Sequence, residues 1–375
     1  MAPIFMATLL ISFPHHILVA LVLQRIFIRS ASDSQSIRYE CKPSVRSCEP
    51  GAEFLVFSTV QNHSRLKTPA IRMEEHFPRN LNVLESEQFN VKNLSEEHRL
   101  YCSTVTLHRR ELIRRSLRAS ISERGEYRFE YADFHAGDFL GFWENDYRIE
   151  NDHSIVIYPP KLENADYLQA FTNEIDEIAL KKQFLEDPIS VRGYREYTGR
   201  EPMRMISWTQ SAVRGSLIVK QFDPVWSQSV LILLDTEYHG NFDCYNQHLE
   251  FCFSLTRTVC DMLEQRQIGY RLMTNAIISS GISSFSGGSG ADASYGKILF
   301  ALGVAKCGSV CTVEELARAA CFGAARREVI VFISSRRDSK TDLALQKAKA
   351  LSGGQVLTLF AEEIGPAQEE GRSAV

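Results

Sequence analysis

Oxygen-bearing side chains follow two apolar runs of the sequence and could together bind a divalent cation. Asp235 and Glu237 come directly after the run Val230–Leu234, and Ser334 ends the run Val329–Ser334. Ligands of open α/β sheets bind outside the carboxyl ends of the strands, so these side chains lie where a site is expected. A hard cation such as Mg²⁺ or Mn²⁺ needs several converging oxygen ligands, and this set is incomplete. We therefore expect no metal and no other cofactor, with metal-dependent binding or hydrolysis at Asp235 as the alternative.

Two further constellations lack parts that their chemistry requires. The glycine-rich segment Gly281–Gly296 fails as a phosphate loop, because Ile298 follows its lysine where Ser or Thr is needed. A nucleophilic set can be drawn from Asp243, Cys244 and His248, but nearness in sequence is weak evidence for one. We therefore predict that the chain is not an enzyme.

The segment Ser190–Pro224 sets arginines among aromatic residues, a mixture that no helix or strand needs merely to form. Arginine offers a planar fork of donors that pairs with carboxylates and stacks on rings. One interpretation is an internal network of ion pairs. The other is a docking surface, because Trp, Tyr and Arg dominate interaction hot spots. The residues open to both interpretations are Arg195, Tyr197, Glu201, Arg204, Trp208, Ser211 and Arg214.

The elements that must position these residues fall into two domains and a connector. Residues 37–160 contain short strand-like runs such as Phe54–Val60 and Ser154–Tyr158, separated by turn residues, which predicts a β-sandwich. Residues 161–189 are rich in charged residues and contain no glycine, and we interpret them as the connector. Residues 190–365 alternate strands and helices, which predicts a doubly wound α/β domain, and 366–375 form a tail.

Within the α/β domain, Val230–Leu234 is a continuous apolar run, as expected of a parallel strand covered on both faces. A helical stripe predicts a helix over Gln247–Gln265, and the spacing of Met203–Arg214 predicts a shorter one. Thr312 to Glu315 has the form of a capping box that opens a further helix. The other predicted strands are Tyr270–Thr274, Val329–Ser334 and Gln355–Phe360.

The N-terminal run Ile4–Ile28 is mostly apolar, and about 20 apolar residues suffice to cross a bilayer as a helix. No Lys or Arg precedes the run, while Arg25 and Arg29 lie near its end, which places the rest of the chain in the cytoplasm. The sequence thus predicts a transmembrane segment in residues 1–30 and a cell-membrane location. A buried helix of the first domain is the alternative. Nine cysteines without a CxxC pair suit a reducing compartment.

The charge of the chain gives no case for nucleic acid as a partner. The net charge is −4, and the basic run from Arg109 to Arg118 is interpreted as a solvated face. We expect no nucleic-acid binding.

The arginine–aromatic segment resembles the signature of the bacterial domain of unknown function 58 family. Glu201 stands at the acid of that signature, and the residues that match it in register are Arg195, Tyr197, Arg204, Ile206, Trp208, Ser211, Ala212, Gly215, Leu217 and Val219. The resemblance implies a membrane-tethered protein with one helix or a shortened hairpin, a β-sandwich accessory domain and a von Willebrand A-like, Rossmann-like domain. Such domains bind a cation through D-x-S-x-S, where this chain has Glu237 and His239 in place of the serines, so the resemblance implies a degenerate metal position.

The same resemblance implies a protein partner. Members of the family are typically encoded beside MoxR-type AAA+ ATPases. We therefore expect a membrane-anchored, non-catalytic scaffold or adaptor that binds such an ATPase.

Overall fold

The chain divides into two compact units, Met1–Pro159 and Pro160–Val375, each described by itself. The structure is a computed structural model. It describes residues 14–23, 25, 37–64, 67–68, 70–84, 90–93, 98–137, 144–162, 172–173, 175, 186–199, 201–224, 230–237, 242–288, 292–322, 329–352 and 356–364.

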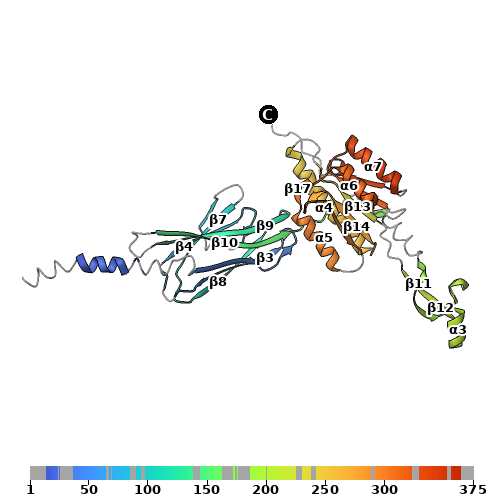
Figure 1. Cartoon of the computed structure of the whole chain (residues 1–375), viewed down its shortest axis with the longest axis horizontal. Helices are drawn as coiled ribbons and strands as arrows, with labels where there is room; N and C mark the ends of the chain where they lie inside the picture. Colours follow the sequence, from blue (N-terminus) through green and yellow to red (C-terminus); the bar gives the residue numbers. More distant parts are fainter. Residues whose placement is uncertain are drawn as a thin grey trace, which may run out of the picture. The chain divides into compact units, whose positions relative to one another are not determined.

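The first unit contains two β-sheets that face each other across a hydrophobic core (Figure 1). The four-stranded sheet has the order β1 (Ile37–Pro43), β3 (Glu53–Asn62), β8 (Leu112–Ser120), β5 (Asn82–Val83). The six-stranded sheet has the order β2 (Ser47–Cys48), β10 (Glu144–Ile157), β9 (Gly125–Gly137), β4 (Ile71–Pro78), β7 (His98–Val105), β6 (Asn90–Asn93).

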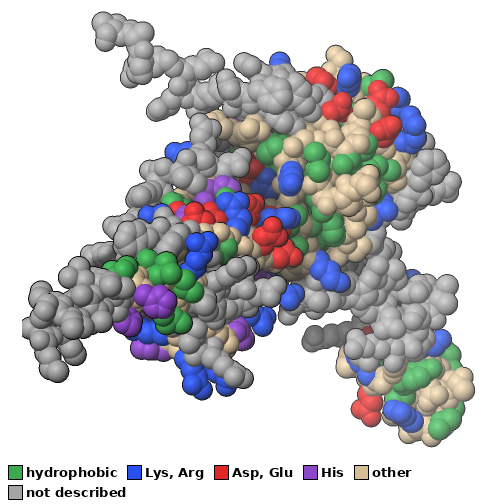
Figure 2. Space-filling model, turned by 60° about the vertical axis from the view of Figure 1, so that its left-hand side comes forward, with side chains coloured by type: hydrophobic (Ala, Val, Ile, Leu, Met, Phe, Trp, Pro, Cys, Tyr) green, Lys and Arg blue, Asp and Glu red, His purple; other side chains and the backbone are tan. Residues whose placement is uncertain are grey.

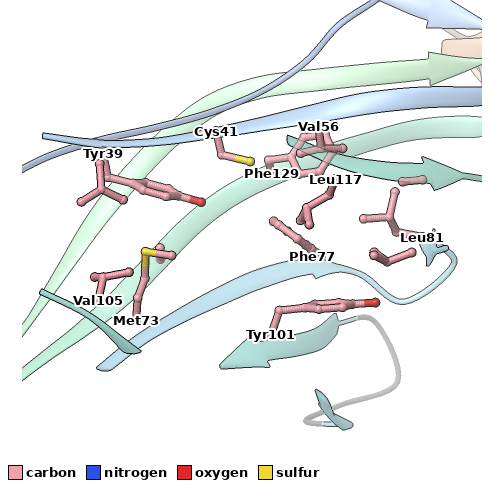
Figure 3. Packing of buried hydrophobic residues seen from close by; sticks show 14 of the residues in the cluster. Tyr39, Cys41, Val56, Met73, Phe77, Leu81, Tyr101, Val105, Leu117 and Phe129 are labelled. Atoms are coloured by element: carbon pink, nitrogen blue, oxygen red, sulfur yellow. The ribbon is translucent and has the colours of Figure 1, made fainter. Parts of the chain in front are cut away.

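The core between these sheets follows from alternation along the strands. In β3 every second side chain is buried, from Phe54 to Asn62, because successive residues of a strand face opposite sides. Figure 3 shows Val56, Phe77 and Phe129 converging from different strands. The fully buried Glu75 carboxylate accepts a hydrogen bond from the Tyr39 hydroxyl (2.8 Å) and pairs with the Arg115 guanidinium (3.1 Å).

The second unit is built on a five-stranded sheet with helices on both of its faces. The strand order is β16 (Ser283–Gly287), β14 (Tyr270–Thr274), β13 (Val230–Leu234), β18 (Val329–Ser334), β19 (Val356–Phe360), and β16 alone is antiparallel to its neighbour. A two-stranded ribbon pairs β15 (Ala276–Ile277) with β17 (Lys306–Ser309).

All five residues of β13 are buried, and alternate residues point to opposite faces of the sheet. Ile232 belongs to the cluster formed with α4 (Phe242–Gln265) and α5 (Asp292–Val304). Leu233 belongs to the cluster formed with α6 (Val313–Phe322) and α7 (Ser339–Ser352). The short α8 (Ala361–Ile364) follows β19 directly.

The arginine–aromatic segment forms a separate small motif. Strand β11 (Glu186–Glu196) pairs antiparallel with β12 (Ile218–Pro224). Between them lie the 3₁₀ helix η2 (Met203–Met205) and the helix α3 (Trp208–Arg214). We call residues 186–199 and 201–224 the signature module.

The N-terminal prediction requires a correction. Residues 14–23 are helical, but no helix in the described part of the chain is both long and apolar enough to span a membrane. Pro14, His15 and His16 shorten the uninterrupted apolar run on which the prediction depended. This finding overturns the transmembrane segment predicted for residues 1–30, the N-terminal membrane helix of the predicted fold class, and the cell-membrane location inferred from them.

Candidate functional site

The signature module has a small core of its own. Ile206, Ile218 and Val219 are buried, at 6%, 1% and 1% exposure. None of them belongs to the hydrophobic clusters that the described residues form in the two units. Backbone hydrogen bonds close the module, from the Tyr197 N–H to the Leu217 carbonyl (2.8 Å) and from the Ser207 N–H to the Ile218 carbonyl (2.8 Å).

Ser211 connects helix α3 to strand β12. Its hydroxyl donates to the Ser207 carbonyl (2.8 Å) and accepts from the Ile218 N–H (2.9 Å). The helix then ends at Gly215, whose φ of 68° is the left-handed conformation that glycine adopts at low cost. Ser211 is therefore a structural residue, buried between the helix and the strand that its hydroxyl connects.

Glu201 is held by two neighbours inside the module. The Arg195 guanidinium lies 2.6 Å from Glu201 Oε1, and the Thr198 hydroxyl donates to the same oxygen (2.7 Å). The hydrogen bond from Thr198 and, after it, that from Arg195 lower the pKa of the Glu201 carboxyl to about 2. This pair is the internal network of one sequence interpretation, and Thr198 is a member that the sequence reasoning missed.

Three of the remaining candidate residues, Arg204, Trp208 and Arg214, face solvent. Helix α3 buries only Ser211, whereas Trp208 is 62% and Val213 is 78% exposed. Met203 in η2 is 69% exposed, and the side chains of Arg204 and Arg214 are exposed as well. We call the large or charged side chains that these two helices expose the η2–α3 surface, and they are Met203, Arg204, Trp208, Val213 and Arg214. Figure 2 shows hydrophobic and basic side chains side by side on this module.

An ordinary amphipathic helix hides its apolar side chains and exposes its polar ones. Helix α3 does the reverse, since it hides a serine and exposes a tryptophan and a valine. Tyr197, half-buried on the loop after β11, is fixed by its backbone hydrogen bond. The seven candidate residues thus fall into three groups. Arg195 and Glu201 form an ion pair, and Tyr197 and Ser211 are held by hydrogen bonds within the module. Arg204, Trp208 and Arg214 are exposed.

Asp235 lies at the carboxyl end of the central strand β13 and is fully buried. Its Oδ1 accepts from the Asn275 side-chain N–H (2.8 Å) and from the Glu237 backbone N–H (3.0 Å), and its Oδ2 accepts from the Ser334 hydroxyl (3.0 Å). The structure therefore does bring Asp235 and Ser334 together across neighbouring strands. Asn275 presents a hydrogen-bond donor to Asp235, and an N–H group cannot be a cation ligand.

Glu237 serves a helix instead of this cluster. Its Oε2 accepts from the Val313 N–H (2.7 Å) at the start of α6, where a negative charge is favourable. The neighbouring Thr312 and Glu315 exchange hydrogen bonds of 3.2 and 3.4 Å, which confirms the predicted capping box. His239 lies outside the described residues. Within the described part of the chain, no group of three or more His, Cys, Asp or Glu is placed to hold a metal ion.

Asn275 is the residue of this cluster that sequence reasoning missed. It also binds the Thr236 N–H through its Oδ1 (2.8 Å) and the Cys311 carbonyl through its N–H (3.1 Å). Its position directly after the predicted strand Tyr270–Thr274, at the same sheet edge as Asp235, was the available signal.

The structure adds no support for the nucleophilic set or for the glycine-rich segment. His248 is half-buried on α4, while the side chains of Asp243 and Cys244 lie outside the described residues. In the glycine-rich segment, Ser283–Gly287 forms the edge strand β16, and residues 289–291 are outside the described part.

Comparison with known proteins gives limited similarity. No protein-family model matches the chain. The uncharacterized protein YeaD of Bacillus subtilis is 26% identical over 124 residues, which cover 30% of this chain and 28% of YeaD. The chain thus spans less than a third of the length of the curated relative that it matches.

Among solved structures, the CARDB domain of a Pyrococcus furiosus protein, determined in complex with di-metal ions, matches with 12% identity and a TM-score of 0.20. The match covers 32% of this chain and 91% of that domain. A non-cellulosomal cohesin from Archaeoglobus fulgidus matches with 11% identity and a TM-score of 0.20, over 32% of this chain and 91% of the cohesin.

The structure corrects the predicted fold class. The described residues are rich in β-strands distributed over several sheets, and they include no helix long and apolar enough to span a membrane. The prediction of a membrane-anchored, von Willebrand A-like fold is therefore wrong as a whole, although a β-sandwich and a sheet with helices on both faces are present.

Proposed function

We propose that this chain is a non-catalytic scaffold or adaptor that binds a protein partner through the η2–α3 surface. The observation that carries the proposal is the exposure of Trp208, at 62%, on a helix that buries only a serine. Tryptophan is among the residues most enriched in interaction hot spots, where it occupies a desolvated pocket.

The energetic argument is that binding would bury side chains that folding leaves exposed. Met203, Trp208 and Val213 are each more than 60% exposed. Burying a large apolar side chain contributes about 1.5–3 kcal/mol, so three such side chains supply a substantial part of a protein–protein affinity. The ordering of the module by the Arg195–Glu201 pair and Ser211 lowers the entropic cost of presenting them.

The partner that we propose is a MoxR-type AAA+ ATPase. The support for this choice is the resemblance of the signature residues to the domain of unknown function 58 family. The exposed surface supports a protein partner in general and is compatible with this one.

Crosslinking in cells, followed by purification of the chain and identification of the bound proteins, tests the proposal. We expect an AAA+ ATPase to be recovered with the natural chain. Trp208→Ala should reduce its recovery at least about tenfold, because truncating a hot-spot tryptophan costs 2 kcal/mol or more.

Phe300→Ala is the matched control, since Phe300 is an exposed aromatic residue (43%) on α5, outside the signature module. It should leave recovery unchanged. Equal recovery with Trp208→Ala and the natural chain would contradict the proposed surface, and recovery of other proteins in place of an ATPase would contradict the proposed partner.

A further inference from the structure

We infer that the partner segment received by the η2–α3 surface is acidic, with carboxylates placed around an apolar anchor. This inference rests on the proposed function and adds the chemistry of the partner. It follows from how the charges of the signature module are used within the module itself.

Within the signature module, the Glu201 carboxylate is already bound, and it is not available to Arg204 and Arg214. Glu201 is engaged by Arg195 and Thr198. Arg204 and Arg214 are exposed and have no ion-pair partner among the described residues. The η2–α3 surface itself carries two arginines and no carboxylate, whereas the chain as a whole has a net charge of −4.

Both arginines are adjacent in sequence to exposed apolar residues. Arg204 follows Met203 in η2, and Arg214 follows Val213 at the end of α3. We therefore expect a partner that covers Met203 and Val213 to approach the two guanidinium groups as well. Desolvating an unpaired guanidinium is costly, whereas pairing it with a carboxylate gives a strong bidentate hydrogen bond. A neutral or basic segment would pay that cost without compensation, which selects for Asp and Glu.

A single-stranded nucleic acid is the other anionic ligand to consider, because tryptophan and arginine can stack on bases. The surface does not favour it. Two of its three large apolar side chains, Met203 and Val213, are aliphatic and offer no ring for stacking. An acidic peptide with Leu or Phe anchors uses all three.

The test uses the full chain and synthetic twelve-residue amphipathic peptides of one design. One peptide combines Glu with Leu and Phe, a second has Gln for every Glu, and a third has Lys for every Glu. A twelve-nucleotide oligo-dT is the fourth probe. Each carries a fluorophore, and binding is measured by anisotropy at 50 and 500 mM NaCl.

We expect the Glu peptide to bind at least about tenfold more tightly than the Gln peptide at low salt, with the difference reduced at high salt, where the Debye length falls to a few ångströms. The double variant Arg204→Glu/Arg214→Glu should reverse the preference, from the Glu peptide to the Lys peptide. Arg114→Glu, which changes an exposed arginine on β8 of the other unit, should preserve the preference for Glu.

Equal affinity for the three peptides, no binding of the Glu peptide, or tighter binding of oligo-dT than of the Glu peptide would overturn the inference. Failure of the inference is distinguishable from failure of the proposed function. If Trp208→Ala abolishes recovery of the crosslinked partner while Arg204→Glu/Arg214→Glu does not, the surface binds a protein whose segment is not acidic.

Discussion

At the scale of single residues, the signature module places two residues of the same type, Arg195 and Arg204, in different surroundings. Arg195 and Arg204 are both arginines in one short segment, yet Arg195 is paired with Glu201 and Arg204 is exposed without an ion-pair partner in the described structure. The turn between β11 and η2 makes this difference, because it brings Glu201 back to Arg195 through Thr198. The Arg195–Glu201 pair holds the turn in place, and this turn positions the residues of the η2–α3 surface that follow it.

The Glu201 carboxyl provides a direct test of that pair. Its folded-state pKa, about 2, lies below the unfolded value of about 4.3, so its stabilising effect is complete above the unfolded pKa and is lost as the pH falls through 2. Thr198→Ala should raise this pKa, and Arg195→Ala should raise it by a smaller amount. Carboxyl ¹³C NMR titration measures both. Thr209→Ala, a change of an exposed threonine on α3, should leave the titration unaltered, and an unshifted pKa in Thr198→Ala would contradict the hydrogen bond.

At the scale of elements, helix α3 depends on how it ends. Gly215 has a φ of 68°, and the space around its α-carbon is open to 4 Å, so an added Cβ would meet strain but no clash. Its N–H donates to the Ser211 carbonyl and closes the last turn (2.9 Å). The same Ser211 then binds β12 through its hydroxyl. The cap therefore connects helix and hairpin.

Replacing Gly215 by Ala should destabilise the module by about 1 kcal/mol, the cost of a left-handed conformation for a residue with a Cβ. Hydrogen exchange of the Ile218 amide, which is bonded to Ser211, should become about fivefold faster in the full chain. Gly281→Ala is the control. An added Cβ at Gly281 would also meet open space, but Gly281 is not one of the glycines with a positive φ. An equal effect of both substitutions would show that strain at the cap is not the cause.

The elements also show what could be predicted from the sequence. The strands Val230–Leu234 and Val329–Ser334 are confirmed residue for residue, since continuous apolar runs bounded by polar residues are a strong local signal. The predicted helix Met203–Arg214 is wrong as one element. Ile206 forms a β-bridge with Val219 and divides it into η2 and α3. That long-range pairing has no local signature.

The burial of side chains along β9 does not alternate regularly over the whole strand. Phe129 and Ala132 both belong to the core, so the alternation shifts by one residue between them. Tyr131 instead packs its ring against His76, with 4.2 Å between the ring centroids. A β-bulge of this kind depends on the partner strand β10, whose register shifts between Glu150 and His153.

At the scale of the whole molecule, the first unit should respond to pH through its histidines. Histidines of the six-stranded sheet are paired with carboxylates, as in His76 with Asp133 (3.2 Å) and His135 with Asp146 (2.8 Å). His76 is nearly fully buried, and burial lowers its pKa despite the neighbouring Asp133. Arg148, which binds Asp133 through two hydrogen bonds, also disfavours a second positive charge there.

The stability of the first unit should therefore fall when His76 is forced to take up a proton. The unfolded chain binds that proton near pH 6.5 and the folded chain only at lower pH, so the free energy of unfolding decreases as the pH falls from 6.5 through the folded pKa. Thermal unfolding followed by circular dichroism between pH 7.5 and 5 measures this loss. His76→Gln should make the pH dependence shallower, whereas His153→Gln, at an exposed histidine, should alter it less. Parallel pH curves for the natural chain and His76→Gln would contradict the assignment.

The central position of β13 has a consequence for synthesis on the ribosome. Val230 pairs with Val329, which is 329 − 230 = 99 residues later in the chain. At roughly 5–20 residues per second, β13 waits on the order of 5–20 s for this neighbour, with the face that α6 and α7 will cover still open. All strands of the sandwich have left the ribosome before that interval begins. Nascent chains arrested between residues 260 and 320 should therefore be the ones that recruit chaperones to the second unit, while the sandwich and the signature hairpin are already formed.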